Sequence, residues 1–221
     1  MKPVLAVFDL DGTLIDSRRD LTDSANEMLA GYGAPPLAEE YIVSMVGCGA
    51  ATLVKRVITA AGVDVVVGDA LASFLAVYDQ RLTHHTRPYD GIPALLDELR
   101  GREIAMALLT NKPLIQSRTI LETFDLSRYF TWVVGGDGPW PRKPAPDGMR
   151  FLMSQASAGP ADAILIGDSI VDLQTSRNAG VRICLARYGF GYADLPAAEL
   201  TGEEALVDTP DEIAEVLDAR R

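Results

Sequence analysis

Short runs of apolar residues recur along the chain, and polar residues follow several of them. Each run is far shorter than the roughly 20 apolar residues of a membrane-spanning helix, and its length fits a buried strand. After residue 90, helical patterns separate the runs. This alternation predicts an α/β protein, with a parallel sheet and helices packed on both of its faces. The runs lie at residues 4–8, 104–109, 131–135, 163–167 and 181–185.

Apolar residues at helical spacing fill the intervals between the expected strands. Between Asp16 and about Thr83 the strand pattern is absent, so we expect an inserted helical segment there. Its expected helices lie at residues 21–32, 38–46, 50–61 and 69–82. Those of the remaining chain lie at 92–99, 114–124, 147–158, 172–179 and 211–217.

Composition and charge exclude several classes of protein. The chain has 221 residues, of which 48% are hydrophobic, so it can bury a sizeable core. A net charge of −11, without a cluster of Lys and Arg, argues against nucleic acid as a partner. Cys48 and Cys184 show no metal-ligand spacing, and free thiols fit a reducing compartment. With no signal-peptide pattern or membrane span, we expect a cytoplasmic protein.

Two acidic residues directly follow the first apolar run, in the segment Asp9-Leu10-Asp11-Gly12-Thr13. On an extended backbone, carboxylates two residues apart point the same way. Acids at the end of a buried strand need a partner, because their desolvation is costly. Hard oxygen ligands suit Mg²⁺. The segment therefore favours a cation site over its alternative, a solvated acidic turn.

Three later segments complete a set of four. The second apolar strand is followed by Thr110-Asn111-Lys112, and Lys143 lies within Arg142-Lys143-Pro144. The strand at 163–167 leads into Asp168-Ser169-Ile170-Val171-Asp172. In this order, the four segments resemble the motifs of the haloacid dehalogenase superfamily, whose members are mostly Mg²⁺-dependent phosphatases. The resemblance extends over roughly Val4 to Tyr192.

The resemblance implies a Rossmann-like core domain and a small α-helical cap inserted into it. The core would comprise residues 1–15 and 90–221, and the cap residues 16–89. The hinges would lie near residues 16–19 and 84–93.

The resemblance also assigns chemical roles. Asp9 would be the nucleophile that forms an aspartyl-phosphate, and Asp11 would protonate the leaving alcohol and later deprotonate water. Mg²⁺ would be held by Asp9, Asp168 and the backbone carbonyl of Asp11. Lys143 would counter the charge that develops on phosphate, with Lys112 and Arg142 as rivals.

Further residues are expected around the phosphate group. Thr110 would donate through its hydroxyl, Asn111 through its backbone or side chain, and Gly12 would lie against the same group. Asp172 has two interpretations of similar weight. It orients a metal-bound water or Lys143, or it is an acid that the dipole favours at a helix N-terminus.

Substrate choice would lie in the cap. Val46-Gly47-Cys48-Gly49-Ala50 resembles a segment of bacterial phosphoglycolate phosphatases. Gly47 and Gly49 could present N–H groups to the carboxylate of a small acid phosphate, although they could also be ordinary glycines between helices. Arg56 is the alternative carboxylate partner. Trp140, just before the lysine motif, is expected beside the site, where it could alter the pocket.

Other functions remain open. A broad sugar-phosphate or nucleotide phosphatase and a phosphoglucomutase-like phosphotransferase would use the same residues. A catalytically silent binding protein on this fold is the alternative of another class. We expect a small phosphorylated metabolite as the partner, no membrane, and a monomer or homodimer.

Overall fold

A six-stranded parallel sheet forms the centre of the molecule, in the order β5-β4-β1-β6-β7-β8. The computed structural model describes residues 5–218, so Val4 and both ends of the expected core domain lie outside the described part. The predicted α/β class is confirmed. The strands are β1 (Leu5–Phe8), β4 (Ala105–Leu109), β5 (Trp132–Val134), β6 (Ala163–Gly167), β7 (Arg182–Ala186) and β8 (Ala205–Val207).

Strand β1 lies between β4 and β6, and the direction of winding changes there. Leu5 pairs with Ala105 on one side and with Ala163 on the other. The chain adds β4 and β5 on one side of β1, then crosses over to add β6, β7 and β8 on the other. In open α/β sheets, ligands bind beyond the carboxyl ends of the strands at such a switch point.

Both faces of the sheet are buried, which explains why its strands are continuously apolar. Ala6 and Phe8 of β1 join one apolar cluster, and Leu5 and Val7 join the other. Among the helices that follow residue 90, three contribute to the first cluster, namely α5 (Ile92–Gly101), α6 (Leu114–Thr123) and α9 (Glu212–Asp218). The same cluster continues into the helices of the inserted segment. Two contribute to the second, namely α7 (Asp147–Gln155) and α8 (Ile170–Ala179). The predicted helices of this region begin and end within three residues of these bounds.

Strand β8 was not predicted, because the chain after Glu199 has a polar pattern. The strand has only three residues and pairs in parallel with β7, with Cys184 opposite Ala205. A segment of this length carries no periodicity, so its pairing partner decides its conformation.

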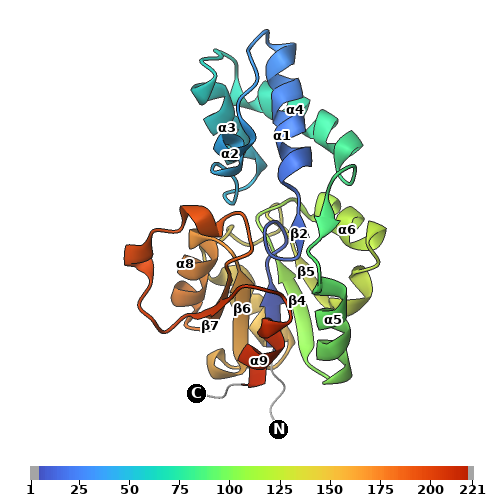
Figure 1. The fold of residues 1–221 in the computed structure, drawn as a ribbon, viewed down its shortest axis with the longest axis vertical. Coiled ribbons are helices and arrows are strands. Elements are labelled where there is room, and N and C mark those ends of the chain that lie inside the picture. The colour runs from blue at the N-terminus through green and yellow to red at the C-terminus, as the bar shows by residue number, and fades with distance from the viewer. Residues whose placement is uncertain (1–4, 219–221) are drawn as a thin grey trace.

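Four helices lie together beyond the carboxyl ends of the strands (Figure 1). The chain enters this helical segment through β2 (Ile15–Asp16) and leaves it through β3 (Arg87–Pro88), which pair antiparallel. We use the word cap for residues 16–89, and this domain division stays a prediction. The helices are α1 (Arg18–Gly31), α2 (Glu39–Val43), α3 (Ala50–Ala60) and α4 (Val67–Arg81).

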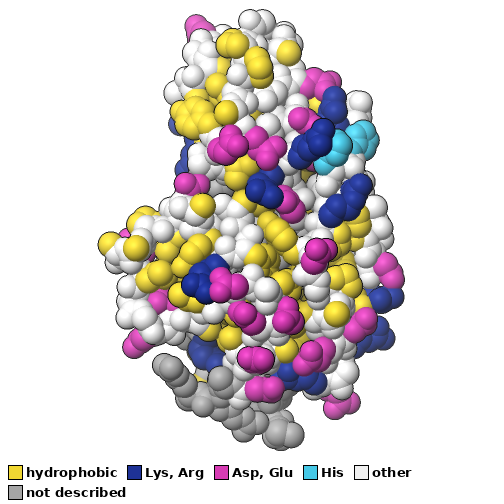
Figure 2. All heavy atoms as spheres, in the orientation of Figure 1, with side chains coloured by type: hydrophobic (Ala, Val, Ile, Leu, Met, Phe, Trp, Pro, Cys, Tyr) yellow, Lys and Arg dark blue, Asp and Glu magenta, His cyan; other side chains and the backbone are white. Residues whose placement is uncertain are grey.

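None of the helices within residues 5–218 is long and apolar enough to cross a membrane. On the face of the molecule shown in Figure 2, acidic and basic side chains are intermingled, without a continuous basic patch.

A buried carboxylate ties the two connections of the cap together. Asp20, in the first turn of α1, is almost fully buried. Its oxygens accept hydrogen bonds from the backbone N–H groups of His85 (2.9 Å) and Thr86 (2.7 Å) and from the Thr86 hydroxyl (2.8 Å). The start of α1 is therefore fastened to the chain that leaves the cap.

Replacement of this carboxylate should destabilise the protein. Asp20→Ala leaves buried donors without an acceptor, and we expect a loss of about 3 kcal/mol in the free energy of unfolding. Asp23→Ala on the same helix removes only a solvent-exposed pair with Arg19 and should cost less than about 0.5 kcal/mol. Urea denaturation measures both, and equal losses would contradict the role given to Asp20.

Candidate active site

Three adjacent strands deliver polar side chains to one place. Asp9 directly follows β1, Thr110 follows β4, and Asp168 follows β6. Lys143 comes from the loop between β5 and α7, and its Nζ lies 2.8 Å from Oδ1 of Asp9. The switch point of the sheet therefore brings together residues from all four predicted motifs.

Three buried carboxylates surround this lysine. Ligand oxygens of Asp9, Asp168 and Asp172 lie within 4.8 Å of one another. Lys143 Nζ pairs with Asp9 and also with Asp172, at 2.6 Å. One ammonium does not balance three carboxylates, so the group fits a divalent cation held by oxygen ligands.

Burial shapes the titration of these groups. Desolvation raises the pKa of Asp9 to about 6, although the Lys143 charge opposes this shift. Desolvation, together with the charges of Asp172 and Asp9, raises the pKa of Asp168 well above its usual range. Burial alone would lower the pKa of Lys143, but Asp172 and Asp9 outweigh it and raise that pKa. Lys143 is therefore protonated. Its single positive charge does not compensate the three carboxylates around it.

Asp172 makes both kinds of contact that the sequence left open. Its Oδ1 accepts a hydrogen bond from Lys143, so it orients the ammonium. Its Oδ2 accepts from the Ser169 hydroxyl (2.6 Å) and N–H (3.1 Å), which caps α8. A Cβ on Gly167 would lie 2.3 Å from the Asp172 carboxyl carbon, so only glycine fits there.

Glycines also pack around Asp168. Gly12 has a φ of +85°, and a Cβ there would lie 1.9 Å from Asp168 Oδ2. The same oxygen accepts a hydrogen bond from the Gly191 N–H at 2.7 Å. Sequence reasoning did not find Gly191, because its partner lies in another strand–helix unit and no local pattern connects them.

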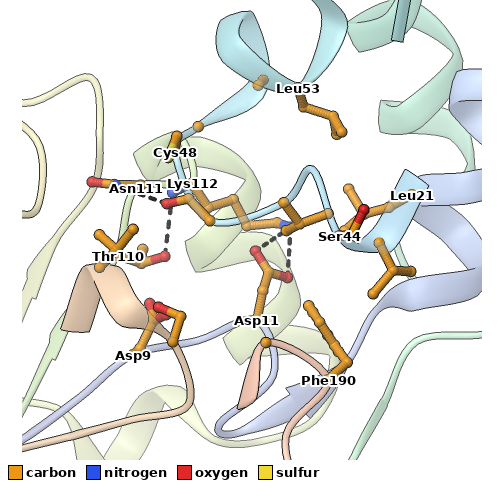
Figure 3. A pocket seen from close by; sticks show the side chains of 18 of the residues that line it. Asp9, Asp11, Leu21, Ser44, Cys48, Leu53, Thr110, Asn111, Lys112 and Phe190 are labelled. Carbon is orange, nitrogen blue, oxygen red and sulfur yellow. Dashed lines mark hydrogen bonds and ion pairs between the residues drawn. The ribbon is translucent and has the colours of Figure 1, made fainter. Parts of the chain in front are cut away.

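The carboxylate of Asp11 turns away from the acidic cluster. It accepts hydrogen bonds from Lys112 Nζ at 2.9 and 3.0 Å (Figure 3). It also accepts one from the Ser17 hydroxyl at 2.6 Å. Lys112, expected as a rival of Lys143, therefore pairs with the other acid of the segment. Ser17 was not predicted at the site. The Asp11 ligand implied by the resemblance is its backbone carbonyl, which stays a prediction.

The two residues after β4 have different hydrogen bonds. The Thr110 hydroxyl oxygen accepts from the Lys112 N–H at 3.2 Å, which leaves its proton for another acceptor. Asn111 Nδ2 donates to the carbonyls of Gly47 and Lys143, both at 2.9 Å. Because these bonds use both amide protons, only the backbone N–H of Asn111 stays a candidate donor to a substrate.

A cavity of about 260 Å³ opens above these groups, between the sheet and the cap. Gly47, Gly49 and Arg56 line it, as do Asp9, Asp11 and Thr110 of the core. The Arg56 guanidinium donates to the Met45 carbonyl at 2.9 Å. The apolar part of the wall includes Leu21, Val43, Val46, Leu53, Phe74 and Phe190.

The expectation for Trp140 is wrong. Its ring stacks on Phe151 of α7, with centroids 4.0 Å apart, and it is not among the cavity-lining residues. An apolar partner outside the site therefore determines its orientation.

Comparison with known proteins identifies the family. Residues 6–186 match the model of the haloacid dehalogenase-like hydrolase family. The chain belongs to this family, and its class is that of the phosphoric monoester hydrolases.

Several individual relatives are similar over nearly the whole chain. Phosphoglycolate phosphatase 1 of Pseudomonas aeruginosa is 35% identical, over 97% of this chain and 82% of the relative. The plasmid phosphoglycolate phosphatase of Cupriavidus necator is also 35% identical, over 99% of this chain and 95% of the relative. A crystal structure described as a predicted phosphoglycolate phosphatase from Haemophilus somnus superimposes with a TM-score of 0.91 at 26% identity, covering 98% of both chains.

Magnesium should stabilise the protein more as the pH rises. Because the folded-state pKa of Asp9 is raised to about 6, folded protein without metal loses stability as the pH increases from about 4 through 6. A bound cation would offset this loss, and its binding requires ionised carboxylates. We expect Mg²⁺ to raise the melting temperature more at about pH 7.5 than at about pH 5. Thermal unfolding with and without Mg²⁺ measures this rise in melting temperature. An equal rise at the two pH values would contradict the prediction, and so would an undiminished rise in the Asp168→Asn variant.

Gly12→Ala should disrupt the Asp168 site. The new methyl group must displace the Asp168 carboxylate, so we expect the Mg²⁺-induced stabilisation to disappear and hydrolase activity to fall about 100-fold. Gly33→Ala is the control, because Gly33 also has a positive φ (+75°) but has open space around its Cβ position. If both variants behave alike, backbone strain rather than the Asp168 contact is responsible.

Proposed function

We propose that this protein hydrolyses 2-phosphoglycolate in a Mg²⁺-dependent reaction that passes through an aspartyl-phosphate on Asp9. The observation that carries the chemistry is the position of Asp9, buried at the switch point with Lys143 Nζ 2.8 Å from its Oδ1. The names of relatives 35% identical over nearly the whole chain support the substrate.

In the first half of the reaction, a carboxylate oxygen of Asp9 forms a bond to phosphorus as the bond to the leaving oxygen breaks. Asp11, which this step requires in its protonated form when substrate arrives, transfers its proton to that oxygen, so glycolate departs as an alcohol. Lys143 holds Asp9 in place and counters the charge on the phosphoryl oxygens, and the Thr110 hydroxyl donates to one of them. Asp172 keeps Lys143 oriented through its own ion pair.

In the second half, Asp11 accepts a proton from water as the water oxygen bonds to phosphorus. The bond between phosphorus and Asp9 then breaks and releases inorganic phosphate. Bound Mg²⁺ would be held by Asp9, Asp168 and the Asp11 carbonyl, and would reduce the repulsion between the phosphate and the carboxylates.

The carboxylate of the substrate would extend toward the cap. Among the cavity-lining residues of the described cap, Arg56 is the charged one, and the neighbouring apolar side chains offer nothing to an anion. Arg56 or the N–H groups of Gly47 and Gly49 would bind the carboxylate. The cytoplasmic location and the monomer-or-homodimer state stay predictions.

Phosphate release from a panel of phosphomonoesters tests this proposal. With Mg²⁺, we expect a preference of about 100-fold or more for 2-phosphoglycolate over sugar phosphates and nucleotides, since a carboxylate partner favours the small acid. Asp9→Asn should lower kcat about 1000-fold or more, because the amide is a poor nucleophile. Excess chelator should abolish turnover.

The other outcomes separate the alternatives. Broad, weak hydrolysis would keep the mechanism and reject the substrate. No phosphate release from any compound, with Mg²⁺ bound, would favour the phosphotransferase or the silent binding protein.

A further inference from the structure

Lys112 connects the acid–base carboxylate of the core to a side chain of the cap. Its ammonium is buried and donates to both oxygens of Asp11, at 2.9 and 3.0 Å. It also donates to the hydroxyl of Tyr78 on α4, at 2.5 Å, and lies 4.7 Å from the centre of that ring. One cation therefore bridges residues from two parts of the molecule.

The bridge has a strong electrostatic basis. Burial opposes the charge on Lys112, but Asp11 and Tyr78 outweigh it and raise the pKa of the ammonium. A buried ammonium requires good partners, because an unpaired one is costly. Tyr78 supplies a hydroxyl acceptor, which is lost if α4 moves away from the core.

The nucleophile has no such dependence. Lys143, the cation beside Asp9, pairs with Asp9 and Asp172, and all three residues belong to the core. The cation that pairs with Asp9 is therefore held by core residues alone, whereas the cation that pairs with Asp11 also contacts α4.

We propose that Lys112 is a positioning residue for Asp11 and that Tyr78 fixes Lys112, so that the contact of α4 with the core helps to hold the proton-transferring carboxylate, together with the hydrogen bond from Ser17. This inference rests on the proposed function. It predicts that loss of the bridge impairs protonation of the leaving group and leaves attack by Asp9 largely intact.

Substrates that differ in their leaving group separate these two steps. An alkyl phosphate such as 2-phosphoglycolate releases an alkoxide, which needs a proton from Asp11. The p-nitrophenolate of p-nitrophenyl phosphate is stable enough to leave without one. A general acid typically contributes 10²–10⁴-fold to the rate, so its misplacement should affect the first substrate only.

The experiment compares kcat and KM of three variants on both substrates. Lys112→Met should lower kcat on 2-phosphoglycolate about 100-fold, and on p-nitrophenyl phosphate less than about threefold, with KM unchanged. Tyr78→Phe, which removes one oxygen atom, should show the same selectivity with a loss of about 10-fold. Thermal unfolding verifies that each variant is folded. If Lys112→Met does not fold, the kinetics of Tyr78→Phe test the inference.

Asp79→Asn is the matched control. Asp79 follows Tyr78 on α4 and also contacts the core, where it accepts a hydrogen bond from Gln116 at 2.8 Å, but it does not touch Asp11 or Lys112. It should leave both substrates unaffected. If it reproduces the selective loss, general loosening of the cap is the cause and the inference fails.

Two further results would overturn the inference. Equal losses on both substrates would give Lys112 a general structural role. A rise in KM for 2-phosphoglycolate alone, with kcat unchanged, would make Lys112 a binding partner of the substrate carboxylate. A native protein inactive on every phosphomonoester would refute the proposed function and this inference with it, whereas an active enzyme with uniform losses refutes the inference alone.

Discussion

Lys143 is buried among carboxylates that it cannot neutralise alone. Its ammonium contacts Asp9 at 2.8 Å and Asp172 at 2.6 Å, and Asp168 completes the group. Surrounding features depend on this arrangement. Gly167 leaves space for Asp172, Gly12 leaves space for Asp168, and Ser169 joins Asp172 to the start of α8. The remaining negative charge is the physical reason to expect a cation at this place.

The two acids of the first motif have separate environments. Asp9 lies among core residues, with Lys143 as its cation, whereas Asp11 faces Lys112 and Ser17 beside the cap. This separation matters chemically, because a nucleophile and a proton-transfer group need different surroundings. The cavity follows the same division, with charged groups at the sheet and mostly apolar side chains on the cap. Substrate choice would then depend on the few polar groups of the cap wall.

Local pattern predicted much of the architecture. The runs that became β1, β4, β5, β6 and β7 were visible because both faces of a parallel sheet are buried. Most helices were visible through their apolar spacing. The polar residues after β1, β4 and β6 were found for the same reason, since they mark where burial ends. Strand β8 was missed because its three residues owe their conformation to pairing with β7.

The sequence by itself determined which elements form, where their polar ends lie and which residue types meet at the site. Only the tertiary structure decided the partners: Lys143 with Asp9, Lys112 with Asp11, Asn111 with Gly47, and Trp140 with Phe151 instead of the cavity. Asp11 and Lys112 are 101 positions apart, and no local periodicity relates residues at that separation. Helix and strand patterns reflect burial over a few residues, whereas ion pairing depends on how strands are ordered in the sheet and how the cap packs above it.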